Sequence, residues 1–172
     1  MDWFRHGVNK PQYVMLEVYE DEDGPNADSD GSYDNPYDDP DFVPNYQRMR
    51  FSLASALLGD GYYSYEINTD GHGSLGLMWF DEYDNAGAGK GWLGKPRGEY
   101  AELPGGAFMR EFNGGLALVN PNGEPVSVTL PKGNWRRIKG TQCPSVNSGE
   151  TVGDTLTLPA FDGLLLVRNI KQ

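Results

Sequence analysis

The clearest periodic pattern in the chain is helical. Apolar residues recur at the spacing i, i+4, i+7 and i+8, which places them on one face of a helix: Met49, Leu53, Ala56 and Leu57. Asn45 can cap the first turn, and Gly59 can end the helix after Leu58. The pattern therefore predicts a helix that runs to Leu58 and buries one face.

Two short runs of β-forming residues flank this helix. Tyr13–Tyr19 follows Pro11, and Tyr62–Ile67 follows a Gly-Asp-Gly turn. A strand, a connection that contains a helix and a second strand form a βαβ unit, whose strands run parallel. Two parallel strands alone leave exposed edges. We therefore expect them to pair with the rest of the chain, with another copy of the chain or with a missing N-terminal part.

After Gly98 the pattern changes to short β runs between turns. The segments AFMREF and LALVN flank an Asn-Gly turn, which is typical of a β-hairpin. Further runs follow between turn residues: PVSVTL, NWRRIK, TVGDTLTL and LLLVRN. Five or six short strands of this kind predict a small antiparallel β-sandwich. The predicted fold class is α+β, mainly β, with a βαβ region over residues 1–98 and the sandwich over residues 99–172.

The net charge of −11 comes from one segment, residues 17–41, which holds eleven Asp or Glu and no Lys or Arg. The other fourteen acidic residues balance the fourteen basic residues, so there is no basic stripe, and this argues against nucleic acid as a partner. Cys143 is the single cysteine, so no intramolecular disulfide can form. No apolar run approaches about 18 residues, and the first residues do not resemble a signal peptide. We expect a soluble protein that does not contact a membrane, in a compartment that the sequence leaves open.

Residues 20–44 are predicted to form an acidic loop, because prolines and turn residues are dense there. Four oxygen-bearing residues follow the spacing of a calcium loop, with Gly31 at its sharp turn: Asn26, Asp28, Asp30 and Asp34. Tyr37 stands where such a loop has a bidentate Glu, so a solvated acidic loop remains the alternative. We expect no required cofactor, with calcium as the candidate ion. Arg48 and Arg50 are expected to pair with this loop.

Several segments together resemble the C-terminal end of a glycoside-hydrolase family: RMRFSLASALLGDGYYSYE, WFDEYD, LGKP, GAFMREFNGGLALVNPNGEPVSVTL and LPAFDGLLLVR. In that family a TIM barrel is followed by a small β-sandwich. The resemblance covers residues 46–172 and extends loosely to Tyr13–Glu20 as the seventh barrel strand. It implies that the helix and the strand after it are the last barrel repeat. A barrel needs eight such repeats, and this chain supplies two strands and one helix.

The resemblance implies an active site at the C-terminal ends of the strands. Glycosidases commonly use two carboxyl groups, roughly 5–10 Å apart. The candidates are Glu17 or Glu20 for one member and Asp70 or Asp81 for the other; Glu66, Glu82 and Asp84 are nearby in the sequence. Four further side chains are candidates for contacting a sugar, because rings offer flat apolar area and His72 lies between two glycines: His72, Trp79, Tyr83 and Trp92. The alternative for the aromatic residues is packing in the core.

Two functions of different classes follow. The first is a carbohydrate-active protein that binds or hydrolyses glycosidic substrates; if it is catalytic, the reaction is hydrolysis of an O-glycosyl bond. The second is a non-catalytic β-sandwich module that binds glycan, with or without calcium, or that supports a catalytic partner. A cleft that joins two carboxyl groups within about 10 Å favours the first.

Overall fold

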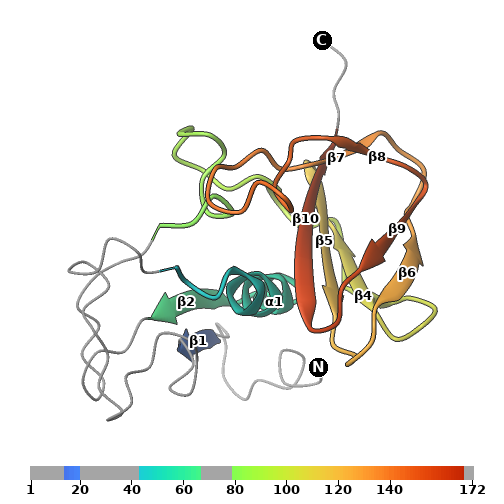
Figure 1. Ribbon diagram of the computed structural model, residues 1–172, viewed down its shortest axis with the longest axis horizontal. Coiled ribbons are helices and arrows are strands. Elements are labelled where there is room, and N and C mark those ends of the chain that lie inside the picture. Colours follow the sequence, from blue (N-terminus) through green and yellow to red (C-terminus); the bar gives the residue numbers. More distant parts are fainter. Residues whose placement is uncertain (1–13, 20–42, 67–78, 169–172) are drawn as a thin grey trace.

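The computed structural model describes residues 14–19, 43–66 and 79–168. Their architecture is mainly β with one helix, as predicted. Strand β1 (Met15–Tyr19) and strand β2 (Tyr62–Glu66) pair in parallel, and helix α1 (Tyr46–Leu57) lies between them in the chain. Figure 1 shows α1 between this two-stranded sheet and the larger β body. The predicted βαβ unit is confirmed.

Helix α1 begins and ends as its sequence predicts. The side chain of Asn45 accepts a hydrogen bond from the backbone N–H of Arg48 at 3.0 Å, which satisfies one free donor of the first turn. The helix ends at Leu57, with Leu58 as its C-cap. Its predicted apolar face is buried at Met49 and at the other central positions, and Leu57 is half-buried.

Within residues 79–168 the strands form two antiparallel layers. The larger sheet has the strand order β3-β4-β5-β10-β7-β8, and β6 pairs with β9 in a separate two-stranded sheet. The bounds are β3 Ala101–Glu102, β4 Phe108–Glu111, β5 Gly115–Asn120, β6 Val126–Thr129, β7 Trp135–Arg137, β8 Thr151–Val152, β9 Thr155–Leu158 and β10 Asp162–Arg168. The predicted hairpin is β4–β5, paired antiparallel. The two-residue strand β3 was not predicted, because it is too short to show alternation.

Strand β10 is buried on both faces, which explains its continuous apolar sequence. Leu164 and Leu166 belong to the core shared with β6 and β9. Leu165 and Val167 face the other way and pack in a core that contains Met49 of α1. A strand covered on both sides needs apolar residues at consecutive positions, so the usual alternation disappears. The six-stranded sheet is therefore covered by α1 on one face and by the β6–β9 pair on the other.

Helix α1 contacts β10 through a close backbone approach and a buried ion pair. The Nε and Nη2 atoms of Arg50 donate to the two carboxylate oxygens of Asp162 at 3.0 and 2.8 Å, and both side chains are 6% exposed. A Cβ atom at Gly163 would collide with the carbonyl oxygen of Arg50 and with Ala54. The predicted pairing of Arg50 with the acidic loop involves residues 20–42, which lie outside the described ranges; the partner that the structure shows is Asp162. This partner stands 112 residues away from Arg50 in the sequence.

A second arginine joins the end of α1 to the same sheet. Arg110 of β4 donates to the carbonyl oxygens of Leu57 and Gly59, at 3.3 and 2.7 Å, and to the carboxylate of Asp60 at 2.8 Å. A cation at this position satisfies free carbonyl groups and interacts favourably with the helix dipole. Helix α1 and the sheet thus share these contacts and a core. The predicted division of the chain between residues 98 and 99 stays a prediction. Within residues 14–19, 43–66 and 79–168, no helix is long and apolar enough to cross a membrane.

We expect Gly163→Ala to lower the free energy of unfolding by about 1–3 kcal/mol, because the added methyl group overpacks the contact between β10 and α1. Gly153→Ala is the matched control, since a Cβ atom there meets only the carbonyl oxygen of Thr155 at 3.9 Å. Urea denaturation of both variants measures the difference. Equal stability of the two variants would contradict the close approach.

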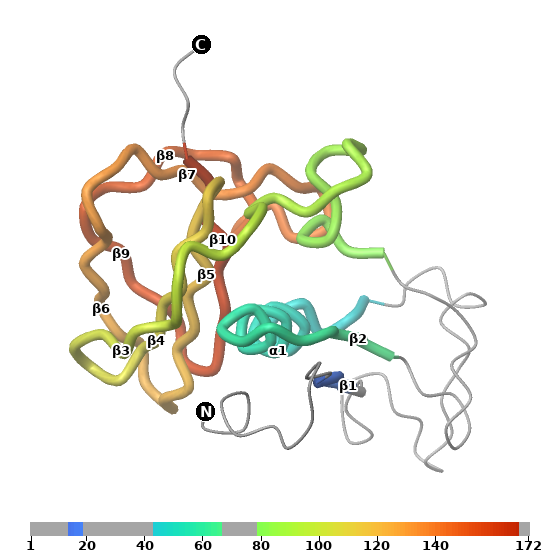
Figure 2. Tube along the Cα trace, turned by 180° about the vertical axis from the view of Figure 1, so that it is seen from behind, coloured from blue at the N-terminus to red at the C-terminus, as the bar shows by residue number. Residues whose placement is uncertain are grey.

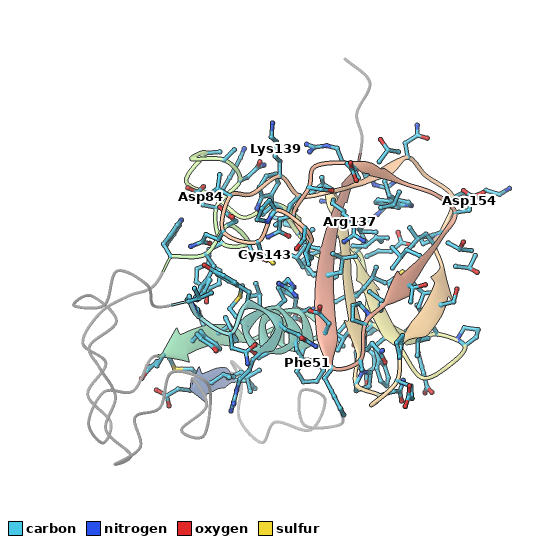
Figure 3. All side chains as sticks on the ribbon, in the orientation of Figure 1. Phe51, Asp84, Arg137, Lys139, Cys143 and Asp154 are labelled. Carbon is cyan, nitrogen blue, oxygen red and sulfur yellow. The ribbon has the colours of Figure 1, made fainter. Side chains whose placement is uncertain are left out.

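We expect Asp162→Asn to destabilise the protein by about 3–5 kcal/mol, because it leaves the buried guanidinium of Arg50 without its counter-charge. Asp154→Asn is the control, since Asp154 is exposed at the far edge of the β body (Figure 3). Urea denaturation at pH 7 checks both. A loss below about 1 kcal/mol for Asp162→Asn would show that the ion pair does not hold the helix in place.

Candidate functional site

A cleft of about 340 Å³ lies where α1, β2 and the segment after residue 79 meet the large sheet. Figure 2 shows the start of this segment, in green, running above α1 toward β3 and β4. The lining is aliphatic and aromatic apart from one carboxyl group: Leu53, Leu57, Tyr63, Glu82, Tyr83, Gly91, Trp92, Leu93, Gly94, Phe112 and Leu165. An apolar cleft with few polar groups is the usual form of a small-molecule site.

Glu82 is the carboxyl group of this cleft, and it is 5% exposed. Burial raises its pKa above the ordinary value, because the charged form loses its hydration. The hydrogen bond that Asn147 Nδ2 donates to Oε1 at 2.8 Å and the positive charge of Arg50 oppose this shift, and the charge of Asp81 adds to it. The net result is a raised pKa, which favours the protonated acid over a wider pH range. A protonated carboxyl group can donate a hydrogen bond or a proton.

Two tyrosines stand beside Glu82 in the cleft. The hydroxyl of Tyr63 shares a 2.8 Å hydrogen bond with the hydroxyl of Ser52, and burial raises the pKa of Tyr63 to about 12. Burial also raises the pKa of Tyr83, and the neighbouring Tyr63 adds to that shift. The two rings are edge to face, with centroids 6.1 Å apart. Both phenols therefore stay neutral at physiological pH and keep an O–H donor.

The turn that carries Glu82 is held from both sides by its neighbours. Phe80 is fully buried and packs edge to face on Tyr65 and Tyr83, with centroids 5.6 and 5.3 Å apart. Asp81 accepts hydrogen bonds from the backbone N–H groups of Thr141 and Gln142 at 2.7 and 2.8 Å. Figure 3 shows Cys143, from this partner loop, below Asp84 and above α1. These contacts fix the backbone on each side of Glu82 and point its side chain into the protein.

The structure describes five of the predicted site residues, and two of these line the cleft. Tyr83 and Trp92 both line the cleft, as a shared binding site requires. Trp79 is 62% exposed and contacts Tyr83 edge-on, with centroids 5.8 Å apart, but it is not part of the lining. The remaining predicted site residues outside the described ranges are Glu20, Asp70, His72, Asn26, Asp28, Asp30 and Asp34.

The two predicted acids that the structure describes lie away from the cleft lining. Glu17 is exposed on β1, in register with Ser64 of β2. Asp81 uses its carboxylate to hold the loop at residues 141–142, which is a structural contact. The cleft lining contains neither residue. Their predicted catalytic roles stay predictions.

Two residues of the site carried no role in the sequence analysis. Glu82 was noted among nearby carboxylates but was not chosen, although its position between Phe80 and Tyr83 is a signal for burial. Asn147, which is 2% exposed, lies in a loop 65 residues further along the chain, and nothing in the local sequence indicates its partner. Among the residues with described positions, no group of three or more His, Cys, Asp or Glu could hold a metal ion. The candidate calcium residues lie outside the described ranges, so the calcium site stays a prediction.

No protein with a curated description matches the chain. Residues 32–116 match the family described as hypothetical glycosyl hydrolase family 15, and this stretch includes α1, β2 and the cleft residues Glu82 and Trp92. The expected resemblance to a glycoside-hydrolase family is thus confirmed for residues 46–116, without a substrate or an activity, and for residues 117–172 it stays a prediction. Over residues 32–116, just under half of its length, the chain is therefore similar to hypothetical glycosyl hydrolase family 15.

Proposed function

We propose that the chain binds a carbohydrate in the cleft between α1 and the large sheet, with Glu82 as the group that donates to a ligand oxygen. The observation that carries this proposal is the placement of one buried carboxyl group among aromatic rings. Aromatic side chains offer rigid apolar area on which the apolar face of a sugar ring packs. The match to a glycosyl hydrolase family over the same residues supports this class of ligand.

Hydrolysis of a glycosidic bond is the reaction that Glu82 would serve best as an acid. Glycosidases protonate the leaving oxygen with a carboxyl group whose pKa is raised, and burial raises the pKa of Glu82. The reaction also takes a second carboxyl group, as base or nucleophile. Among the described residues that line the cleft, Glu82 is the one that carries a carboxyl group. Binding is therefore the primary proposal, and hydrolysis is its extension.

We expect Gly91→Leu to abolish ligand binding without unfolding the protein. Gly91 lines the cleft, and a Cβ atom there meets nothing within 4 Å, so a larger side chain can enter the open space. Gly98→Leu is the matched control, because a Cβ atom at Gly98 also meets nothing and the residue does not line the cleft. Calorimetric titration with a panel of oligosaccharides, together with thermal melts, measures both properties.

Three outcomes of this experiment are informative. Binding that Gly91→Leu removes and Gly98→Leu keeps supports the cleft as the sugar site. Binding that survives in both variants places the sugar elsewhere and overturns the proposal for this cleft. Carbohydrate would be removed as the ligand if no oligosaccharide binds the wild-type protein and if the protein also hydrolyses no aryl glycoside.

We expect Glu82→Gln to change how stability depends on pH. Below the ordinary pKa, near 4.5, Glu82 carries a proton in both the folded and the unfolded chain. As the pH rises from there, the unfolded chain loses this proton first, so the wild-type free energy of unfolding falls until the raised pKa of the folded state is passed. The Gln variant lacks this fall, and Glu102→Gln, at an exposed site, keeps it.

Urea denaturation at constant ionic strength between pH 4 and pH 8 provides the comparison. A pH profile of Glu82→Gln that runs parallel to that of the wild type would contradict the raised pKa. The same variant also separates binding from hydrolysis. If the chain hydrolyses glycosides, Glu82→Gln loses about a hundredfold or more of its turnover and retains sugar binding, because only proton donation is removed.

A further inference from the structure

Arg137 occupies an unusual position for a charged residue. It is the last residue of β7, and Trp135, two residues earlier, belongs to the core between the large sheet and the β6–β9 pair. Side chains alternate along a strand, so Arg137 projects to the same side as Trp135. Its partner in the register on β10, Leu166, belongs to that core as well. A half-buried guanidinium therefore enters the space between the two layers (Figure 3).

Among the residues that the structure describes, the guanidinium of Arg137 has one hydrogen-bond acceptor. Its Nη1 atom donates to the carbonyl oxygen of Val146 at 3.2 Å. None of the carboxylates in residues 14–19, 43–66 and 79–168 forms an ion pair with it. Asp162 is close by, but both of its oxygens are held by Arg50. A cation that is partly removed from water needs a counter-charge, and here the described residues leave most of its five N–H donors for another group.

A second cavity lies at this guanidinium. Its volume is about 180 Å³, and it is separate from the cleft at Glu82. The walls come from β7, the loop at residues 145–146, the end of β9 and the start of β10: Arg137, Ser145, Val146, Thr157, Leu158, Pro159, Asp162, Gly163 and Leu164. Ser145 adds a hydroxyl group to the donors of Arg137, and the charge of Asp162 is balanced by Arg50.

We propose that this cavity binds a compact oxyanion, which Arg137 holds through paired N–H groups and Ser145 holds through its hydroxyl. The planar guanidinium presents two parallel donors that match the spacing of two oxygens on one carboxylate or sulfate. The oxyanion supplies the counter-charge that the described residues do not provide. The same chemistry is found in a free inorganic ion and in the acidic group of a sugar such as a uronic acid. This proposal does not depend on the function proposed for the other cleft.

Titration of the intact protein with sodium sulfate, with glucuronate and with glucose, each at constant ionic strength held with sodium chloride, tests the proposal. Backbone amide signals of Ser145, Val146 and Gly163 in nuclear magnetic resonance spectra are the readout. We expect saturable shifts with sulfate or glucuronate and none with glucose. Arg137→Met weakens this binding by about tenfold or more, because it removes hydrogen bonds to a charged group.

Arg136→Met is the matched control, because Arg136 is the neighbouring arginine on β7 and projects to the opposite face. It is expected to bind the anion as the wild-type protein does. Arg137→Lys keeps the charge and loses the paired donors, so it is expected to bind several-fold more weakly than the wild type, and it serves as the test if Arg137→Met does not fold. Tighter binding of glucuronate than of sulfate would identify an acidic sugar as the source, and the reverse order would identify a free oxyanion.

Two results would overturn the proposal. One is a wild-type protein whose amide signals do not saturate with either anion. The other is an equal response of the Arg137 and Arg136 variants, which would show that the anion is attracted by the general charge of the strand and not by the cavity.

Discussion

The contact between α1 and β10 is the interaction on which the rest of the structure depends. Gly163 allows the backbone of the strand to approach the helix at Arg50, and Asp162 accepts both arms of that arginine. A buried ion pair gives little net stability compared with apolar packing, but it allows only one position, because a shifted helix would bury two unpaired charges. The pair therefore fixes where the helix lies on the sheet. The cleft follows from this placement, since Leu53 and Leu57 of the docked helix form one of its walls.

The sequence predicts those features whose causes are local. The cap at Asn45, the apolar face that contains Met49 and the β4–β5 hairpin each depend on residues a few positions apart, and each is observed. The parallel order of β1 and β2 also follows from the helix between them. The partner of Arg50 could not be found in this way, because it stands 112 residues away and a nearer acidic segment offered an obvious alternative. Long-range pairing is decided by the packing of the sheet, which a charge pattern does not encode.

The candidate site shows the same limit within two consecutive residues, Asp81 and Glu82. Asp81 and Glu82 are both carboxylates in one aromatic segment, and composition cannot separate them. The structure gives Asp81 the backbone N–H groups of a neighbouring loop, whereas it places Glu82 beside Asn147 in an apolar cleft. The difference arises because successive residues of the turn face opposite sides. Residues 32–116, which match the glycosyl hydrolase family, contain Glu82, but its hydrogen-bond partner Asn147 lies beyond them.

The buried charges explain why the two cavities should have different chemistry. Burial raises the pKa of Glu82, because its ionised form would lose hydration, and the positive charge of Arg50, which is paired with Asp162, opposes this shift without cancelling it. The cleft at Glu82 is therefore suited to a neutral ligand that accepts a hydrogen bond. Asp162 also forms part of the second cavity, where Arg137, which has no ion-pair partner in the part of the chain that the structure describes, adds a positive charge to an otherwise balanced pair. The ion pair fixes the helix and so helps to form two sites of different chemistry. The cleft at Glu82 disfavours charge, and the cavity at Arg137 is suited to a negatively charged group.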